Sequence, residues 1–171
     1  MDYPLSSLIT QPSASSQRLF AEEVAREVQV QPEHACFEVT DDGLRMRGIT
    51  EIDLEIAFES VRQRFPSAQR GKPEVAYIFQ PEFTEPCYIA TVHTPAQKAA
   101  NVLADLSMRR GIILSVKDLP EARQIVVDLP VSETFGYSTT LRALTEGRGR
   151  YTVAVGGYRK AGSSGLANDA V

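Results

Sequence analysis

Five arginines in the C-terminal half are of the residue type that can contact phosphate groups. They are Arg109, Arg110, Arg142, Arg148 and Arg150. A guanidinium group is planar and carries a fork of N–H donors, so it suits bidentate contact with phosphate oxygens. The first two follow a predicted helix, and the last two lie in a Gly-Arg-Gly-Arg sequence after another. These five side chains are the candidate site for contact with RNA.

Each of these arginines also has a structural interpretation. Arg109 and Arg110 lie at the negative end of a predicted helix, where a cation compensates the helix dipole by about 0.3–1 kcal/mol. The Gly-Arg-Gly-Arg sequence is typical of a solvated turn. Arg142, inside a helix, fits a solvated residue or an internal ion pair. The sequence leaves both interpretations open, and it does not show whether the two helix ends are adjacent.

Other kinds of site lack the necessary pattern. His34 and His93 are isolated from residues at metal-ligand spacing, so no metal site is predicted. No serine or cysteine stands in a nucleophile-elbow pattern. Gly71-Lys72 is followed by proline and lacks the rest of a phosphate-binding loop, so the chain itself is not expected to bind or hydrolyse GTP. The chain is therefore predicted not to be an enzyme and to need no cofactor.

The segment that positions Arg142, Arg148 and Arg150 has the pattern of a strand, a helix and a second strand. Pro130 ends an apolar run, because proline cannot continue a strand ladder. Ser132 or Thr134 is predicted to cap the helix. Gly147 is predicted to take the left-handed conformation that ends it.

The whole chain contains the order strand, helix, strand, strand, helix, strand twice. The predicted elements of the first half are a strand at 3–10, a helix ending near 28, strands at 35–39 and 44–48, a helix from 50 to 65, and a strand at 74–79. Those of the second half are a strand at 86–93, a helix starting at a Thr94 cap, strands at 112–116 and 123–129, the helix described above, and a strand at 152–158. This order predicts an α+β fold of two tandem ferredoxin-like (βαββαβ) sandwiches.

Composition agrees with one or two small globular domains. The chain has 171 residues and a formal net charge of −4, and residues 1–82 carry −6 whereas residues 83–171 carry +2. A nucleic-acid surface is therefore expected in the second half. Cys36 and Cys87 lie in apolar runs and are expected to be reduced. No apolar run reaches the length of a membrane span, and no signal peptide is apparent, so a cytoplasmic location without membrane association is expected.

The second half also resembles a known family. Without a gap it carries motifs typical of the end of elongation factor G: Ser132-Glu133, Phe135-Gly136-Tyr137, Thr139, Leu141-Arg142, Leu144-Thr145, Gly147-Arg148-Gly149 and Tyr151. Earlier segments, Glu85-Pro86 and Leu106-Ser107-Met108-Arg109-Arg110-Gly111, match as well. On this basis residues 83–160 resemble the fifth domain of that factor.

The first half resembles the third domain of the same factor. The segments 47–56 and 71–77 carry the resemblance, although Thr50 and Asp53 depart from the family pattern. Residues 1–82 are therefore assigned as a third-domain-like unit, and residues 161–171 as a tail expected to be disordered. The GTPase, β-barrel and fourth domains of the factor have no counterpart in this sequence.

The resemblance implies a non-catalytic module that binds the ribosome, with large-subunit RNA and protein as partners. One alternative is a protein-interaction module that binds a GTPase supplied in trans, or a second copy of itself. An acylphosphatase-like enzyme on the same fold would need an anion-cradling loop after the first strand, and neither 11–15 nor 94–96 suits that purpose. An RRM is disfavoured because the strand 123–129 has no aromatic residue.

Overall fold

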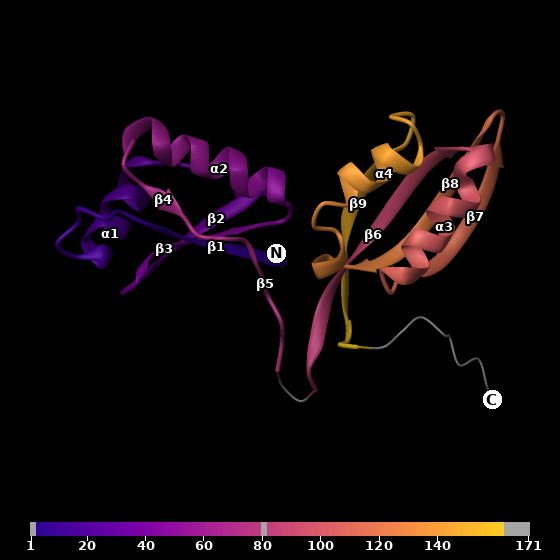
Figure 1. Ribbon diagram of the computed structural model, residues 1–171. Coiled ribbons are helices and arrows are strands. Elements are labelled where there is room, and N and C mark those ends of the chain that lie inside the picture. The colour runs from indigo at the N-terminus through magenta and orange to yellow at the C-terminus, as the bar shows by residue number, and fades with distance from the viewer. Residues whose placement is uncertain (1–2, 80–81, 163–171) are drawn as a thin grey trace. The chain divides into compact units, whose positions relative to one another are not determined.

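The computed structural model describes residues 3–79 and 82–162. The chain divides into two compact units, Met1–Ala76 and Tyr77–Val171, each described here by itself (Figure 1). Most of the segment predicted as a disordered tail, from residue 163 onward, lies outside the described residues.

The first unit is an antiparallel sheet with two helices. Its elements are β1 (Leu5–Thr10), α1 (Gln17–Glu27), β2 (Ala35–Thr40), β3 (Gly43–Gly48), α2 (Glu51–Arg64), β4 (Gln69–Arg70) and β5 (Glu74–Val75). The strand order is β2-β3-β1-β4, and β5 also pairs with β1. This is the order of a ferredoxin-like sandwich.

Short polar side chains start both helices of the first unit. The Ser16 hydroxyl accepts a hydrogen bond from the Leu19 N–H at 3.3 Å, which satisfies a free donor at the start of α1. At α2, the Thr50 hydroxyl accepts from the Asp53 N–H at 3.2 Å, and the Asp53 carboxylate accepts from the Thr50 N–H at 2.9 Å. The two bonds form a capping box, as the acidic residue three positions after Thr50 predicts.

The closing strand of the first unit differs from the prediction of a strand at 74–79. Instead, two short strands flank Gly71-Lys72-Pro73. Pro73 has no N–H to donate to a ladder, so the pairing with β1 is interrupted there. The gap is bridged by the Gly71 N–H, which donates to the Leu8 carbonyl at 2.8 Å. β4 and β5 therefore both pair with the same edge of β1.

The second unit repeats this architecture with longer strands. Its elements are β6 (Thr84–Pro95), a 3₁₀ turn (Ala96–Lys98), α3 (Ala99–Met108), β7 (Ile112–Leu119), β8 (Ala122–Pro130), a 3₁₀ turn (Val131–Glu133), α4 (Tyr137–Leu144) and β9 (Arg150–Lys160). The strand order is β7-β8-β6-β9, with every neighbouring pair antiparallel. The predicted α+β fold of two ferredoxin-like units is confirmed.

Helices α3 and α4 cover the same face of the second sheet, where they form the core (Figure 1). Alternate residues of β6 and β8 point into it, as the period of two along a strand requires. The core residues are almost completely buried: Ala90, Val92, Val102, Leu106, Ile125, Val127, Leu129, Tyr137 and Leu141. This packing leaves the opposite residues of each strand on the other face of the sheet.

Two predicted helix caps are wrong. Thr94 is 1% exposed on the core side of β6 and does not cap α3, which begins only after a 3₁₀ turn. Neither Ser132 nor Thr134 caps α4, because both belong to the tight turn that leaves β8. The N-cap of α4 is Gly136, which has a left-handed φ of 71°. Glycine adopts that conformation without steric penalty.

The buried phenol of Tyr137 gives a first testable prediction. Its hydroxyl is buried and has no hydrogen-bond partner among the described residues, while its ring packs edge-on against Tyr151 with centroids 5.0 Å apart. Burial raises the pKa of this phenol. Tyr137→Phe keeps the ring and removes an unsatisfied polar atom, so urea unfolding should show a stability unchanged or raised by about 1 kcal/mol. A loss of stability above about 1 kcal/mol would show that the Tyr137 hydroxyl does have a hydrogen-bond partner.

Candidate nucleic-acid interface

Arg110 lies in a cluster of charged side chains inside the second unit. Its guanidinium donates to both carboxylate oxygens of Glu85, at 2.6 and 3.0 Å, and to Glu133 at 2.9 Å. The Glu85 side chain is only 3% exposed. Arg159 lies 3.8 Å from Glu85 and donates to the Arg110 carbonyl at 2.6 Å. Glu85, Arg110, Glu133 and Arg159 are called the Glu85 cluster below, and their carboxylates raise the pKa of Arg110.

Arg109 is also bound within the molecule. Its guanidinium donates to the Asp105 carboxylate at 2.9 Å, to the Glu133 carbonyl at 2.8 Å and to the Thr140 hydroxyl at 3.0 Å. It also lies over the Tyr137 ring, 5.1 Å from the centroid, in a cation–π contact. Through these bonds Arg109 ties the end of α3 to the start of α4.

The backbone at the end of α3 explains why Arg110 points toward Glu85. The Gly111 N–H donates to the Leu106 carbonyl at 2.9 Å, and the Arg110 N–H donates to the Ser107 carbonyl at 3.1 Å. These two bonds are those of a Schellman motif, which places Arg110 in the left-handed position with φ of 60°. Gly111 fills the next position because a Cβ there would lie 2.7 Å from the Leu106 carbonyl oxygen.

The structure therefore supports the structural interpretation of Arg109 and Arg110 over an RNA contact. Most of their N–H donors are used within the second unit, and their side chains are 20% and 27% exposed. An RNA phosphate would have to compete with a buried carboxylate for Arg110. Their role goes beyond compensating the dipole of one helix, since both join separate elements.

Arg142, Arg148 and Arg150 lie in a different environment. All three are exposed. Within the described residues, the guanidinium groups of Arg142 and Arg150 form no ion pair or hydrogen bond, and Arg148 has only a 3.4 Å contact with Glu146. Their donors are therefore available to a ligand.

The two groups of arginines lie at opposite ends of the sheet. Arg110 binds Glu85 at the start of β6, whereas Arg150 pairs in register with His93 near its end. Glu85 and His93 are eight positions apart on β6, which corresponds to about 27 Å of strand. The two helix ends, whose adjacency the sequence left open, therefore do not form one surface.

Thr145 fixes the loop that carries Arg148. Its hydroxyl is fully buried, donates to the Leu141 carbonyl at 2.6 Å and accepts from the Gly149 N–H at 2.7 Å. The residues after it, Glu146 and Gly147, both have positive φ, of 54° and 78°. The predicted left-handed Gly147 is thus observed, but the left-handed turn begins one residue earlier. The loop is tied at both ends and presents Arg148 and Arg150 outward.

Replacing Thr145 by valine should loosen this loop without removing an arginine. The change leaves the Gly149 N–H without its acceptor, so the second unit should lose about 1–3 kcal/mol of stability. Hydrogen exchange at Gly149 should accelerate. Thr145→Ser, which keeps the hydroxyl, is the matched control and should retain slow exchange; equal exchange in both variants would show that the hydroxyl does not hold the loop.

A surface hollow of about 600 Å³ adjoins the loop. The end of β6, the β7–β8 turn and the loop before β9 line it, with His93, Gln97, Glu121, Arg148 and Arg150 among the polar residues. The sequence analysis considered His93 only as a metal ligand and predicted no such role, and the position of His93 beside Arg150 follows from strand register. The hollow presents both exposed arginines of the loop to one ligand.

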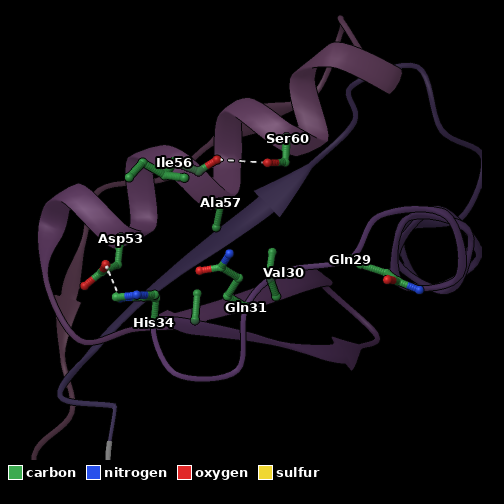
Figure 2. A pocket seen from close by; sticks show the side chains of 9 residues that line it. Gln29, Val30, Gln31, His34, Asp53, Ile56, Ala57 and Ser60 are labelled. Atoms are coloured by element: carbon green, nitrogen blue, oxygen red, sulfur yellow. Dashed lines mark hydrogen bonds and ion pairs between the residues drawn. The ribbon is translucent and has the colours of Figure 1, made fainter.

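A second hollow, of about 350 Å³, lies in the first unit between α2 and the segment before β2 (Figure 2). His34 and Asp53 point toward one another there, with the His34 Nδ1 3.1 Å from the Asp53 carboxylate. The Ser60 hydroxyl donates to the Ile56 carbonyl of its own helix, so the three residues do not form a catalytic triad. The lining holds no lysine or arginine, and Asp53 serves the capping box of α2.

Three further properties concern metal ligands, the two cysteines and membrane-spanning helices. Among the described residues, no group of histidine, cysteine and acidic side chains is arranged to hold a metal ion. Cys36 and Cys87 are free thiols, as expected, and burial raises the pKa of Cys87 to about 12. Over residues 3–79 and 82–162, no helix is both long enough and apolar enough to cross a membrane.

The fold of this chain is similar to that of a protein of known structure. A protein from Thermus thermophilus with a known crystal structure has a similar fold, with a TM-score of 0.58 and 14% sequence identity. The match covers 95% of this chain and 41% of that protein, so this chain spans less than half of its length. At this identity the likeness concerns the fold alone.

The family comparison concerns the second unit. Residues 82–167 match the family described as "Elongation factor G C-terminus". The match includes the Glu85 cluster, the loop that carries Arg148 and both helices of the unit. The resemblance predicted from the motifs is confirmed, and the chain is a translation-factor-like module. It belongs to the elongation factor G C-terminus family.

Proposed function

We propose that this chain binds the ribosome, contacting large-subunit RNA and protein through the end of the second unit that carries Arg142, Arg148 and Arg150. The observation that carries this proposal is the contrast between the two sets of arginines. Arg109 and Arg110 are bound internally, whereas these three are exposed, and two of them flank a hollow. Exposed guanidinium groups suit phosphate contact, and a loop tied by the Thr145 hydroxyl loses little backbone freedom on binding.

The proposal also covers the assignment of the two units, the lack of catalysis and nucleotide binding, and the location of the chain. Residues 1–82 correspond to a third-domain-like unit, and residues 83–160 to a fifth-domain-like unit. The chain acts without catalysing a reaction and without binding a nucleotide, in the cytoplasm where ribosomes are found. Its family membership and the positive charge of the second half support this assignment.

Co-sedimentation with purified ribosomal subunits tests the proposal. At low salt, the chain should pellet with the large subunit and remain in the supernatant with the small subunit alone. Binding should weaken steeply as salt rises, because phosphate contacts release counterions. Recovery in the supernatant with both subunits at low salt would contradict the proposal.

A second candidate function, protein binding, rests on an exposed aromatic stack at the start of the second unit. The rings of Tyr77 and Phe83 lie 5.2 Å apart, and those of Phe79 and Phe83 lie 5.0 Å apart. Phe79 is 72% exposed. The segment from 73 to 86 contains three glutamates and no lysine or arginine, which favours a protein partner over RNA.

If the protein partner is a second copy of the same chain, self-association can be measured with the purified protein alone. Sedimentation velocity over a wide concentration range should show a dimer if the aromatic stack pairs with a second copy, and Phe79→Ser should abolish it. A monomer at all concentrations would contradict self-association through these rings. Ribosome binding unaffected by Phe79→Ser would separate this candidate from the first.

A further inference from the structure

The face of the second sheet opposite α3 and α4 carries a row of polar side chains across all four strands. The core residues Val92 and Ile125 point toward the helices, so their neighbours His93 and Gln124 point to the other face. Strand register extends the row in both directions: Gln124 pairs with Lys117 on β7, and His93 pairs with Arg150 on β9. The cationic row is defined as Lys117, Gln124, His93 and Arg150.

The cationic row combines positive charge with accessibility. Lys117 and Arg150, at its two ends, are exposed, and Gln124 and His93 between them are half-buried. Three strand spacings of about 4.8 Å separate the two ends, so the row is about 14 Å wide.

The next row on the same face is formed by small side chains. The strand pairing places Ser115, Val126, Thr91 and Thr152 in register across the four strands. Three of these side chains carry a hydroxyl group, which donates hydrogen bonds to phosphate or ribose oxygens. Because none is bulky, a polynucleotide backbone has room to approach the cationic row closely.

The acidic groups nearby do not neutralise the row directly. Asp118 accepts from Arg123 at 2.6 Å. Asp128 lies four residues along β8 from Gln124, which corresponds to about 13 Å. Glu121 lines the hollow at the end of the sheet, where Arg148 and Arg150 lie as well. In the described part of the chain, neither Lys117 nor Arg150 forms an ion pair with an acidic side chain.

We propose that this face of the sheet, against which the second unit packs no helix in its described residues, binds the phosphodiester backbone of RNA without reading its bases. This inference rests on the proposed function and extends its contact surface from the Arg148 loop across the sheet. The two rows contain no phenylalanine, tyrosine or tryptophan, which separates this mode from the stacking sheets of RRM domains, in which such rings hold bases. Backbone contact alone predicts strong salt dependence and weak sequence preference.

Fluorescence anisotropy with labelled oligouridylate and oligoadenylate tests this face independently of the ribosome. The wild-type chain should bind both probes with affinities equal within about twofold, because the contacts are to phosphate. Lys117→Glu should weaken binding of both probes by about tenfold and lower the slope of log affinity against log salt by about 1. Lys117→Arg should keep wild-type affinity.

The matched control is Lys160→Glu, which makes the same change of charge at the far end of β9. Ten residues separate it from Arg150, about 33 Å of strand. The face assignment is overturned if Lys160→Glu weakens binding as much as Lys117→Glu, if neither variant has an effect, or if the wild-type chain binds neither probe. Binding of these probes is measured without ribosomes, so failure of this face and failure of ribosome binding are separate results.

Discussion

Replacement of Arg110 by methionine should lower the free energy of unfolding of the second unit by about 3 kcal/mol. The reason is the burial of Glu85, whose side chain is 3% exposed and receives two hydrogen bonds from Arg110. Without Arg110, Arg159 at 3.8 Å is the one cationic partner that this carboxylate keeps among residues 3–79 and 82–162. An uncompensated buried charge is far more destabilising than the loss of an exposed ion pair.

Urea unfolding monitored by hydrogen exchange in β6 measures this effect in the second unit alone. Arg142→Met is the matched control, because Arg142 is exposed and has no ion pair or hydrogen bond within the described part of the chain. It should change stability by less than about 0.5 kcal/mol. The double variant Arg110→Met/Glu85→Leu should recover part of the loss, since it removes both charges. Equal effects of Arg110→Met and Arg142→Met would contradict the structural role of the Glu85 cluster.

Reversal of Arg148 and Arg150 to glutamate should weaken ribosome binding by about a hundredfold at low salt. Each arginine is proposed to contact a phosphate, and each reversal replaces attraction by repulsion, for which about tenfold per site is expected. Both side chains are exposed and neither belongs to the core, so the fold should be unaffected. Equilibrium binding to purified large subunits measures the change.

A control with the same change of charge is available in the first unit. Arg62 and Arg64 lie in the last turn of α2, with side chains 57% and 62% exposed. Their double reversal to glutamate should weaken binding by no more than about threefold, through the change in net charge alone. If the two double variants lose affinity equally, the binding is nonspecific and the assignment of the Arg148 loop is wrong.

Much of the fold could be predicted because local patterns and long-range structure agree. Apolar residues alternate in the strands and recur at helical spacing, and the capping box at Thr50 marks the start of α2. The order of elements then limits the topology to a ferredoxin-like unit, used twice. The family could be identified because many motif residues occur together without a gap in the second half.

The partners of the arginines were harder to predict. Asp105 lies four residues before Arg109 on α3, so their ion pair could have been inferred from helical spacing. Glu85, in contrast, lies 25 residues before Arg110 in the sequence. Their contact depends on a Schellman turn that puts a non-glycine residue in the left-handed conformation, and no local pattern indicates that.

The position of the exposed arginines also depends on tertiary structure. The sequence placed both arginine pairs at helix ends, but α3 and α4 end at opposite ends of the sheet. The cationic row escaped prediction for the same reason, since Lys117 and Arg150 are brought into line only by the register of four strands. Register is a property of the assembled sheet, whereas sequence spacing describes one strand at a time.

The salt dependence of ribosome binding tests the central claim, that exposed arginines of the second unit contact RNA phosphates. For the wild-type chain, log affinity should fall linearly with log salt concentration. The slope should decrease by about 1 for Arg148→Gln and again for Arg150→Gln, because each change removes one phosphate contact. Binding that is insensitive to salt, or a slope that both substitutions leave unchanged, would contradict the claim.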